Sequence, residues 1–161
     1  MKNKYHKLII TMFTVITITL SACGSTQVDY TTANKNTDEK TLTAQVSAEP
    51  DSIETDENGM KMVTYDKSVY GDYTGKMVYY FLEDKLMMSR WEISYDDEKK
   101  MKKTYQDLCS LNEKEYGKGT ESEEKTSCNW SLDEKDITVG YNSGDDGCSV
   151  YILENEHEVE N

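Results

Sequence analysis

Two stretches rich in aromatic and aliphatic side chains, MVYYFL from Met77 and LMMSRWEISY from Leu86, are separated by a short polar break, and this pattern constrains the fold more than any other feature. In a β-strand every second side chain lies on one face. A polar break at Glu83, Asp84 and Lys85 predicts a tight turn, so the stretch is expected to form a β-hairpin. The residues expected on its core face are Met77, Tyr79, Phe81, Met87, Trp91, Ile93 and Tyr95.

With a three-residue turn, Phe81 faces Met87 across the hairpin and Met77 faces Trp91. The opposite face also carries apolar side chains. An apolar outer face of a sheet often marks a contact surface, so this face is the candidate surface for a protein or envelope partner. The alternative is a second layer formed by residues 60–75. The candidate contact residues are Tyr80, Leu82, Leu86 and Met88.

A helix is predicted after the hairpin. The acidic run from Asp96 to Glu98 suits a helix N-terminus, and Gly117 is the expected C-cap after Tyr116. The lysines from Lys99 to Lys103 form its solvated face. Its apolar stripe contains Met101, Tyr105, Leu108, Leu111 and Asn112.

Four further strands are expected at residues 61–65, 127–132, 136–141 and 148–153, with Trp130 facing Val139. The element order is therefore β-β-β-α-β-β-β. This order predicts an α+β fold in which an antiparallel sheet of about six strands carries one amphipathic helix on one face.

The domain is expected to span residues 60–153. Residues 23–59 are polar and contain Tyr30 as their single aromatic residue, so they are predicted to form a disordered stalk. Such a stalk would reach roughly 30–35 Å. The alternative is a strand within Thr41–Ala48. Residues 154–161 are predicted to be an acidic, frayed tail.

The first 22 residues have the organisation of a signal peptide. Lys2, Lys4 and Lys7 precede an apolar stretch from Leu8 to Leu20. This stretch is shorter than the roughly 17–25 apolar residues that a membrane-spanning helix needs. Residues 1–22 are therefore expected to direct export.

The residues that end this segment, Leu20-Ser21-Ala22-Cys23, resemble the lipobox of bacterial lipoproteins. The resemblance implies that Cys23 carries a diacylglyceryl group and becomes the first residue of the mature chain. Two acyl chains suffice for stable anchoring, so the protein is expected on the extracytoplasmic face of the cell membrane. The alternative is an ordinary secreted protein that is cleaved after Ala22.

Composition excludes several function classes. The chain has 18 basic and 31 acidic side chains, and removal of the leader lowers the net charge from −13 to −16, which argues against nucleic acid as a partner. His6 lies in the leader and His157 in the tail, which argues against histidine-dependent catalysis and His-based zinc sites.

No phosphate-binding glycine motif is present, and residues 142–147 (NSGDDG) are expected to form a turn rather than a calcium site. No catalytic residue, metal site or cofactor is predicted, and carboxylate-based activity is the residual enzymatic alternative.

The tyrosine-rich hairpin, the helix that ends at Tyr116-Gly117 and the strands that begin with Trp130 carry a second, looser resemblance. They are similar to small α+β modules of the β-lactamase-inhibitor-protein and outer-membrane assembly lipoprotein kinds. This resemblance implies a non-enzymatic binding or interaction module.

Three cysteines follow the anchor cysteine. In the expected register Cys128 and Cys148 lie two strand spacings apart, roughly 9–10 Å, which is beyond the ~7 Å limit for a disulfide. A bridge is therefore expected from Cys109 in the helix to either Cys128 or Cys148. The unpaired thiol motivates the alternative function, a small thiol-redox or metal-handling envelope protein.

Overall fold

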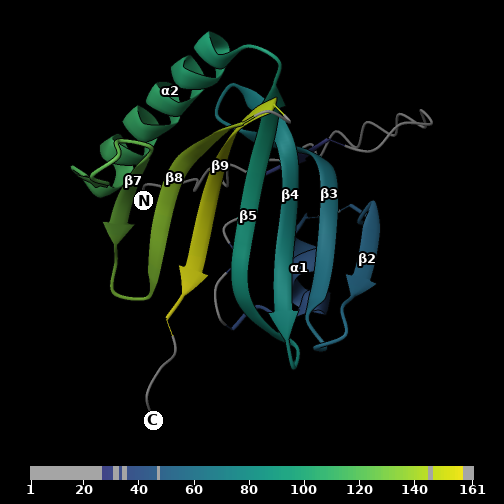
Figure 1. Ribbon diagram of the computed structural model, residues 1–161. Coiled ribbons are helices and arrows are strands. Elements are labelled where there is room, and N and C mark those ends of the chain that lie inside the picture. The colour runs from purple at the N-terminus through teal and green to yellow at the C-terminus, as the bar shows by residue number, and fades with distance from the viewer. Residues whose placement is uncertain (1–26, 31–32, 34–35, 47, 145–146, 158–161) are drawn as a thin grey trace, which may run out of the picture.

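The computed structural model describes residues 27–30, 33, 36–46, 48–144 and 147–157 (Figure 1). Within these residues nine strands form one sheet in the order β1-β3-β4-β5-β9-β8-β7-β6, and β2 also pairs with β3. The strands are β1 (Val28–Asp29), β2 (Ser52–Thr55), β3 (Lys61–Tyr70), β4 (Tyr73–Leu82), β5 (Lys85–Tyr95), β6 (Thr120–Glu121), β7 (Ser127–Ser131), β8 (Lys135–Gly144) and β9 (Gly147–Glu156). The helices are α1 (Glu39–Val46) and α2 (Glu98–Tyr116).

The predicted α+β architecture is confirmed in outline and corrected in detail. The described sheet has nine strands rather than about six, and it is mixed because β1 runs parallel to β3. The additional strands β1, β2 and β6 contain only two to four residues each. Strands this short carry too little alternation to be recognised in the sequence.

The hairpin of β4 and β5 forms where it was predicted, but its turn has a different geometry. Leu82 pairs with Lys85, so the turn contains two residues, Glu83 and Asp84, both with positive φ. Positive φ at both central positions is the geometry that matches the twist of a two-residue hairpin.

A bulge next to this turn explains why part of the predicted hairpin register is right and part is wrong. Phe81 pairs with Leu86 rather than with Met87, and the register shifts before the next pair. The shift restores the expected pairing of Met77 with Trp91. The shorter turn moves the strand by one residue, and the bulge moves it back.

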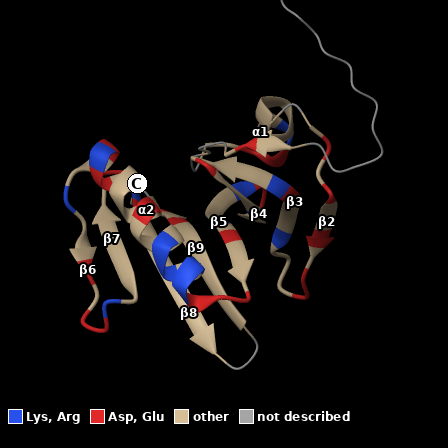
Figure 2. Ribbon diagram, turned by 90° about the horizontal axis from the view of Figure 1, so that it is seen from above, with Lys and Arg blue, Asp and Glu red and all other residues tan. Residues whose placement is uncertain are grey.

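Helix α2 begins and ends at the predicted signals. The side chain of Asp97 accepts hydrogen bonds from the backbone N–H groups of Lys99 at 2.8 Å and Lys100 at 3.3 Å. Gly117 ends the helix with a φ of 83°. The lysines of its first turns, which are blue on the ribbon in Figure 2, have exposed side chains. Its buried residues are Met101, Thr104, Leu108 and Asn112.

Strand β9 joins the two halves of the sheet, because it pairs with β5 on one side and with β8 on the other. In the meander Trp130 pairs with Ile137, and Cys128 pairs with Val139. The predicted pairing of Trp130 with Val139 is therefore wrong by two residues. A shift of two residues keeps each side chain on its face, and Trp130 is buried in the core.

Both helices pack on the same face of the sheet. Leu42 of α1 and Leu108 of α2 are fully buried in one continuous core. Glu39, at the start of α1, binds Lys61 of β3. Lys61 pairs directly with Phe81, which is buried in this core, so α1 covers the same face of the sheet. Figure 1 shows α1 behind β3 and β4. Among the described residues, neither helix has the length and apolar content needed to cross a membrane.

Residues 23–59 are predicted to form a disordered stalk, and this prediction is wrong for the part of the segment that the structure describes. Val28, Ala33 and Leu42 are buried in the core, and β2 pairs with β3 from Ser52 to Thr55. The alternative strand within Thr41–Ala48 is also wrong, because α1 occupies most of it. The segment has too few apolar residues to form a core of its own, but single side chains add to one that already exists.

The predicted tail is shorter than expected. Strand β9 continues to Glu156, and the side chain of Glu154 is 5% exposed, with an Oε2–Nζ distance of 2.8 Å to Lys135. The backbone N–H of His157 donates to the carbonyl of Glu134 at 2.9 Å. Residues 158–161 lie outside the described residues.

Candidate functional site

The predicted contact face is present in part. Tyr80 and Met88 pair directly and are partly exposed, and Leu82 is 37% exposed. Leu86 is 2% exposed and points into the core, so its prediction as a contact residue is wrong. The bulge that follows Leu86 places it on the same face as Phe81. The alternative, in which residues 60–75 form a second layer over this face, is wrong, because residues 61–70 form the adjacent strand β3 of the same sheet.

The structure brings together one of the two predicted cysteine pairs. Cys109 of α2 and Cys128 of β7 are both free thiols, and they are close enough for each to shift the pKa of the other. Cys148 is elsewhere, with its Sγ 3.1 Å from the carbonyl oxygen of Tyr95. Cys23, the predicted lipid-attachment residue, lies outside the described residues.

Within the pair, Cys128 is buried and Cys109 is partly exposed. Burial raises the pKa of the Cys109 thiol to about 12 and also raises the pKa of the Cys128 thiol. The Tyr105 hydroxyl is hydrogen-bonded to Cys109, while Glu113 and Glu121 add negative charge nearby. Both side chains are therefore protonated thiols at neutral pH, the opposite of a nucleophilic cysteine.

A pocket of 390 Å³ lies where the C-terminal half of α2 meets β1, the end of β3 and β9. Its volume falls in the range of pockets that hold small molecules. Its described lining includes three tyrosines and three carboxylates and no lysine, arginine, histidine, serine or cysteine. We call it the tyrosine pocket, and its lining residues are Asp29, Tyr30, Val69, Tyr70, Gly71, Leu111, Glu115, Tyr116 and Glu154.

Hydrogen bonds and ring contacts hold the walls of the tyrosine pocket. The rings of Tyr30 and Tyr70 meet edge to face with centroids 4.7 Å apart. The Tyr70 hydroxyl donates to Asn112 Oδ1 at 3.3 Å, which ties β3 to α2. The hydroxyls of Tyr30 and Tyr116 are hydrogen-bonded to Glu154 and Glu115 respectively.

These bonds set the ionisation of the tyrosines in the pocket. Burial, together with the negative charge of Glu154, raises the pKa of Tyr30 well above its usual value. Burial and the hydrogen bond to Glu115 raise the pKa of Tyr116. Both rings therefore stay neutral, and each hydroxyl serves as a donor that holds a carboxylate in place.

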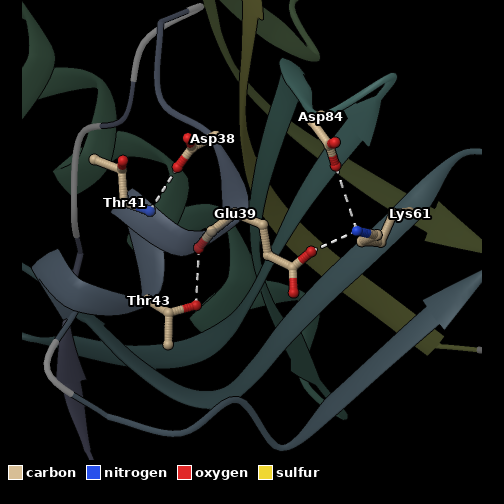
Figure 3. A network of polar contacts seen from close by, with 6 residues as sticks. All are labelled: Asp38, Glu39, Thr41, Thr43, Lys61 and Asp84. Carbon is tan, nitrogen blue, oxygen red and sulfur yellow. Dashed lines mark hydrogen bonds and ion pairs between the residues drawn. The ribbon is translucent and has the colours of Figure 1, made fainter.

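A second hollow lies beside α1, where Lys61 links the helix to the β4–β5 turn (Figure 3). The Lys61 Nζ lies 2.5 Å from Glu39 Oε2 and 3.5 Å from Asp84 Oδ1. Asp38 caps α1 by accepting a hydrogen bond from the backbone N–H of Thr41 at 2.7 Å. The polar groups here bind one another across the hollow, so we interpret them as a structural network that holds α1 on the sheet.

Within the part of the chain that the structure describes, no three His, Cys, Asp or Glu side chains are grouped to hold a metal ion. Residues 142–144 and 147 belong to the β8–β9 hairpin, and the two residues between them lie outside the described set.

Sequence reasoning did not identify the tyrosine pocket. Its walls come from four segments that are distant in the chain, and no local motif joins them. One signal was available: Tyr30 is the single aromatic residue between Gly24 and Gly59. A lone aromatic side chain in a polar segment is a candidate for packing against a distant core.

Comparisons of the chain with protein-family models, with curated proteins and with solved structures give no match.

Proposed function

We propose that this chain is a lipid-anchored, non-enzymatic binding module on the extracytoplasmic face of a bacterial membrane, and that the tyrosine pocket is its binding site. The anchor is supported by the leader, with its three lysines and apolar stretch, and by the lipobox that ends at Cys23. The observation that carries the binding role is the described lining of the pocket, where tyrosines and carboxylates meet without a basic side chain.

The ligand class that fits this lining is a small organic ammonium ion. Aromatic rings attract cations through their negative faces, with about 0.5–1 kcal/mol per contact at exposed sites and more when water is excluded. Glu115 and Glu154 add formal negative charge on two sides of the pocket. Lys135 neutralises part of the charge of Glu154, so Glu115 and the tyrosines are the groups on which selectivity for a cation depends.

The ordered N-terminal segment also sets how far the pocket lies from the membrane. Asp29 is six residues after Cys23, and a fully extended chain of that length spans about 20 Å. A domain whose pocket is lined by Asp29 and Tyr30 is therefore held within about 20 Å of the lipidated residue. We infer a membrane-proximal site instead of a domain raised on a long stalk.

The alternative role in thiol redox or metal handling has less support. A redox-active cysteine needs a stabilised thiolate, whereas burial raises the pKa of both Cys109 and Cys128. A metal-handling role needs converging ligands, and the described residues contain no such group of three.

Calorimetric titration of the detergent-solubilised mature lipoprotein with choline tests the binding role. The matched control ligand is 3,3-dimethylbutan-1-ol, which has the shape of choline without its charge. The detergent must itself carry no cationic group. We expect choline to bind at least about tenfold more tightly than the neutral alcohol, because the rings and carboxylates favour the charge. Equal affinities would contradict the proposed ligand class.

Two variants place the binding in the pocket. Tyr116→Ala is expected to weaken choline binding about two- to fivefold, which corresponds to the loss of one cation–π contact. Glu115→Gln removes one negative charge from the lining, and Glu113→Gln removes the same charge from an exposed position of α2 outside the lining. Glu115→Gln should weaken binding and Glu113→Gln should not. The same effect from both variants would show that general charge attracts the ligand.

A further inference from the structure

We propose that Cys109 and Cys128 form a disulfide in the exported protein and that Cys148 stays a free thiol. This inference rests on the proposed extracytoplasmic location, because disulfides persist in oxidising compartments. It goes beyond the binding role, since it assigns a covalent modification that joins α2 to the edge of the sheet. The sequence left two pairings open, and the geometry distinguishes between them.

The two thiols approach each other from different elements. Cys109 lies next to the fully buried Leu108 in α2, and Cys128 is 4% exposed in β7. One helical turn before Cys109, Tyr105 packs edge to face on Tyr141 of β8, and beyond Cys109 the carbonyl of Gly117 accepts a hydrogen bond from Trp130 of β7. The turn of α2 that carries Cys109 therefore lies over the part of β7 and β8 where Cys128 pairs with Val139, and the two thiols are close enough to interact. Gly119 leaves room for the Cys128 side chain, since a Cβ atom there would lie 2.5 Å from the Cys128 Sγ.

Cys148 is excluded as a partner by its place in the sheet. It pairs with Tyr95 at the end of β5, just before α2 begins, whereas Cys109 is eleven residues beyond the start of α2 at Glu98. Eleven residues of helix correspond to about 16 Å along the axis.

A Cys128–Cys148 bridge is excluded for a similar reason. β8 lies between the two strands, and Cys128 faces Val139 while Cys148 faces Ser143. Two strand spacings and an offset of four residues place the two cysteines about 16 Å apart.

The bridge forms by thiol–disulfide exchange with a disulfide donor, either a small molecule or an oxidised protein dithiol. One cysteine loses its proton, attacks the donor disulfide and releases one donor thiol. The second cysteine then loses its proton and attacks the mixed disulfide, which releases the second donor thiol. The two cysteines are together oxidised by two electrons, and the donor disulfide is reduced to two thiols.

The bridge also supports the binding site. Residues 109–128 include the last two turns of α2, and these turns contribute Leu111, Glu115 and Tyr116 to the tyrosine pocket. Joining Cys109 to β7 restricts the movement of this wall relative to the sheet.

Peptide mapping tests the pairing directly, because trypsin places the three cysteines on three separate peptides. These are residues 104–114, 126–135 and 136–161. The protein is isolated from the bacterial envelope with free thiols blocked by N-ethylmaleimide and is then digested without reduction. We expect a cross-linked peptide of residues 104–114 and 126–135, together with an alkylated peptide of residues 136–161. Three alkylated linear peptides, or any cross-link that contains Cys148, would overturn the proposal.

A second measurement separates a failure of geometry from a failure of the proposed location. The reduced protein, purified with its anchor in detergent, is treated with oxidised glutathione, and a Cys148→Ser variant is treated in parallel. Both should form the same Cys109–Cys128 cross-link. Absence of the cross-link in both would overturn the geometric basis of the proposal. A cross-link formed in vitro but missing from envelope-isolated protein would overturn the proposal through the location on which it rests.

Discussion

Replacing Trp130 by Ala removes the side chain that fills the space between the end of α2 and the sheet. Trp130 is 4% exposed, and its Nε1 donates to the carbonyl of Gly117, the C-cap of α2, at 2.8 Å. The indole also packs closely against Gly119, where a Cβ atom would lie 2.7 Å from the ring. The substitution therefore empties a closed space and leaves a capping carbonyl without its partner.

The expected loss in the free energy of unfolding is about 3–5 kcal/mol, the usual range when a buried Trp becomes Ala. The hydrogen bond to Gly117 accounts for about 0.5–1.5 kcal/mol of this loss. Trp130→Phe keeps a six-membered ring but removes the N–H donor and part of the indole volume, so it is expected to lose about 1–3 kcal/mol. The difference between the two variants then measures the packing of the ring that Phe retains.

Urea unfolding followed by far-ultraviolet circular dichroism measures the effect, with every sample kept reduced so that a disulfide cannot contribute. With a slope of about 2 kcal/mol per molar urea, the midpoint of Trp130→Ala should fall by about 1.5–2.5 M. Ser131→Ala is the matched control, since Ser131 is the exposed neighbour of Trp130 on the opposite face. A loss below about 1 kcal/mol for Trp130→Ala would refute the packing that we describe.

Three further predictions address the anchor, the hairpin and the thiols. Cys23→Ala should move the protein from the membrane to the soluble fraction, because the acyl chains are the expected anchor. Retention of this variant in the membrane fraction after a salt wash would contradict the lipid anchor. Leu86→Ala should lower the free energy of unfolding by about 2–5 kcal/mol and Leu82→Ala by less than about 0.5 kcal/mol, because Leu86 is buried and Leu82 is exposed. Similar losses for the two variants in urea unfolding would disprove the bulged register. Burial raises the pKa of Cys109 to about 12 and raises that of Cys128, so bridge formation with oxidised glutathione should accelerate about tenfold per pH unit between about pH 7 and 9. A rate that levels off within this range would show that one thiol has an ordinary pKa.

The sequence by itself determined the elements whose signals are local. The aromatic-rich run from Met77 to Phe81 predicts β4, and the capping residues Asp97 and Gly117 predict both ends of α2. The adjacency of the two hairpin strands also follows from the sequence, because two strands joined by a short turn must lie side by side, whereas the pairing of Met77 with Trp91 depends on the bulge. Each of these features depends on residues that are close together in the chain, so a pattern of period two or a single cap is enough to specify it.

Only the tertiary structure decided the features that depend on distant residues. The bulge that turns Leu86 into the core arises from the geometry of a two-residue turn, which the polar run from Glu83 to Lys85 does not specify. The attachment of Val28 and Leu42 depends on a core that the rest of the chain supplies, because a segment with so few apolar residues has no local reason to be ordered.

The tyrosine pocket and the cysteine pair also depend on distant residues. The tyrosine pocket joins Tyr30 to Tyr116 across 86 positions of sequence, and Cys109 meets Cys128 only because α2 returns the chain to the far edge of the sheet. Contacts between distant segments are set by how the elements pack, and packing depends on shape and volume throughout the core. For this reason the sequence predicted most of the described strands, whereas the position of the pocket and the choice of cysteine partner came from the folded chain. The leader and the anchor residue stay predictions.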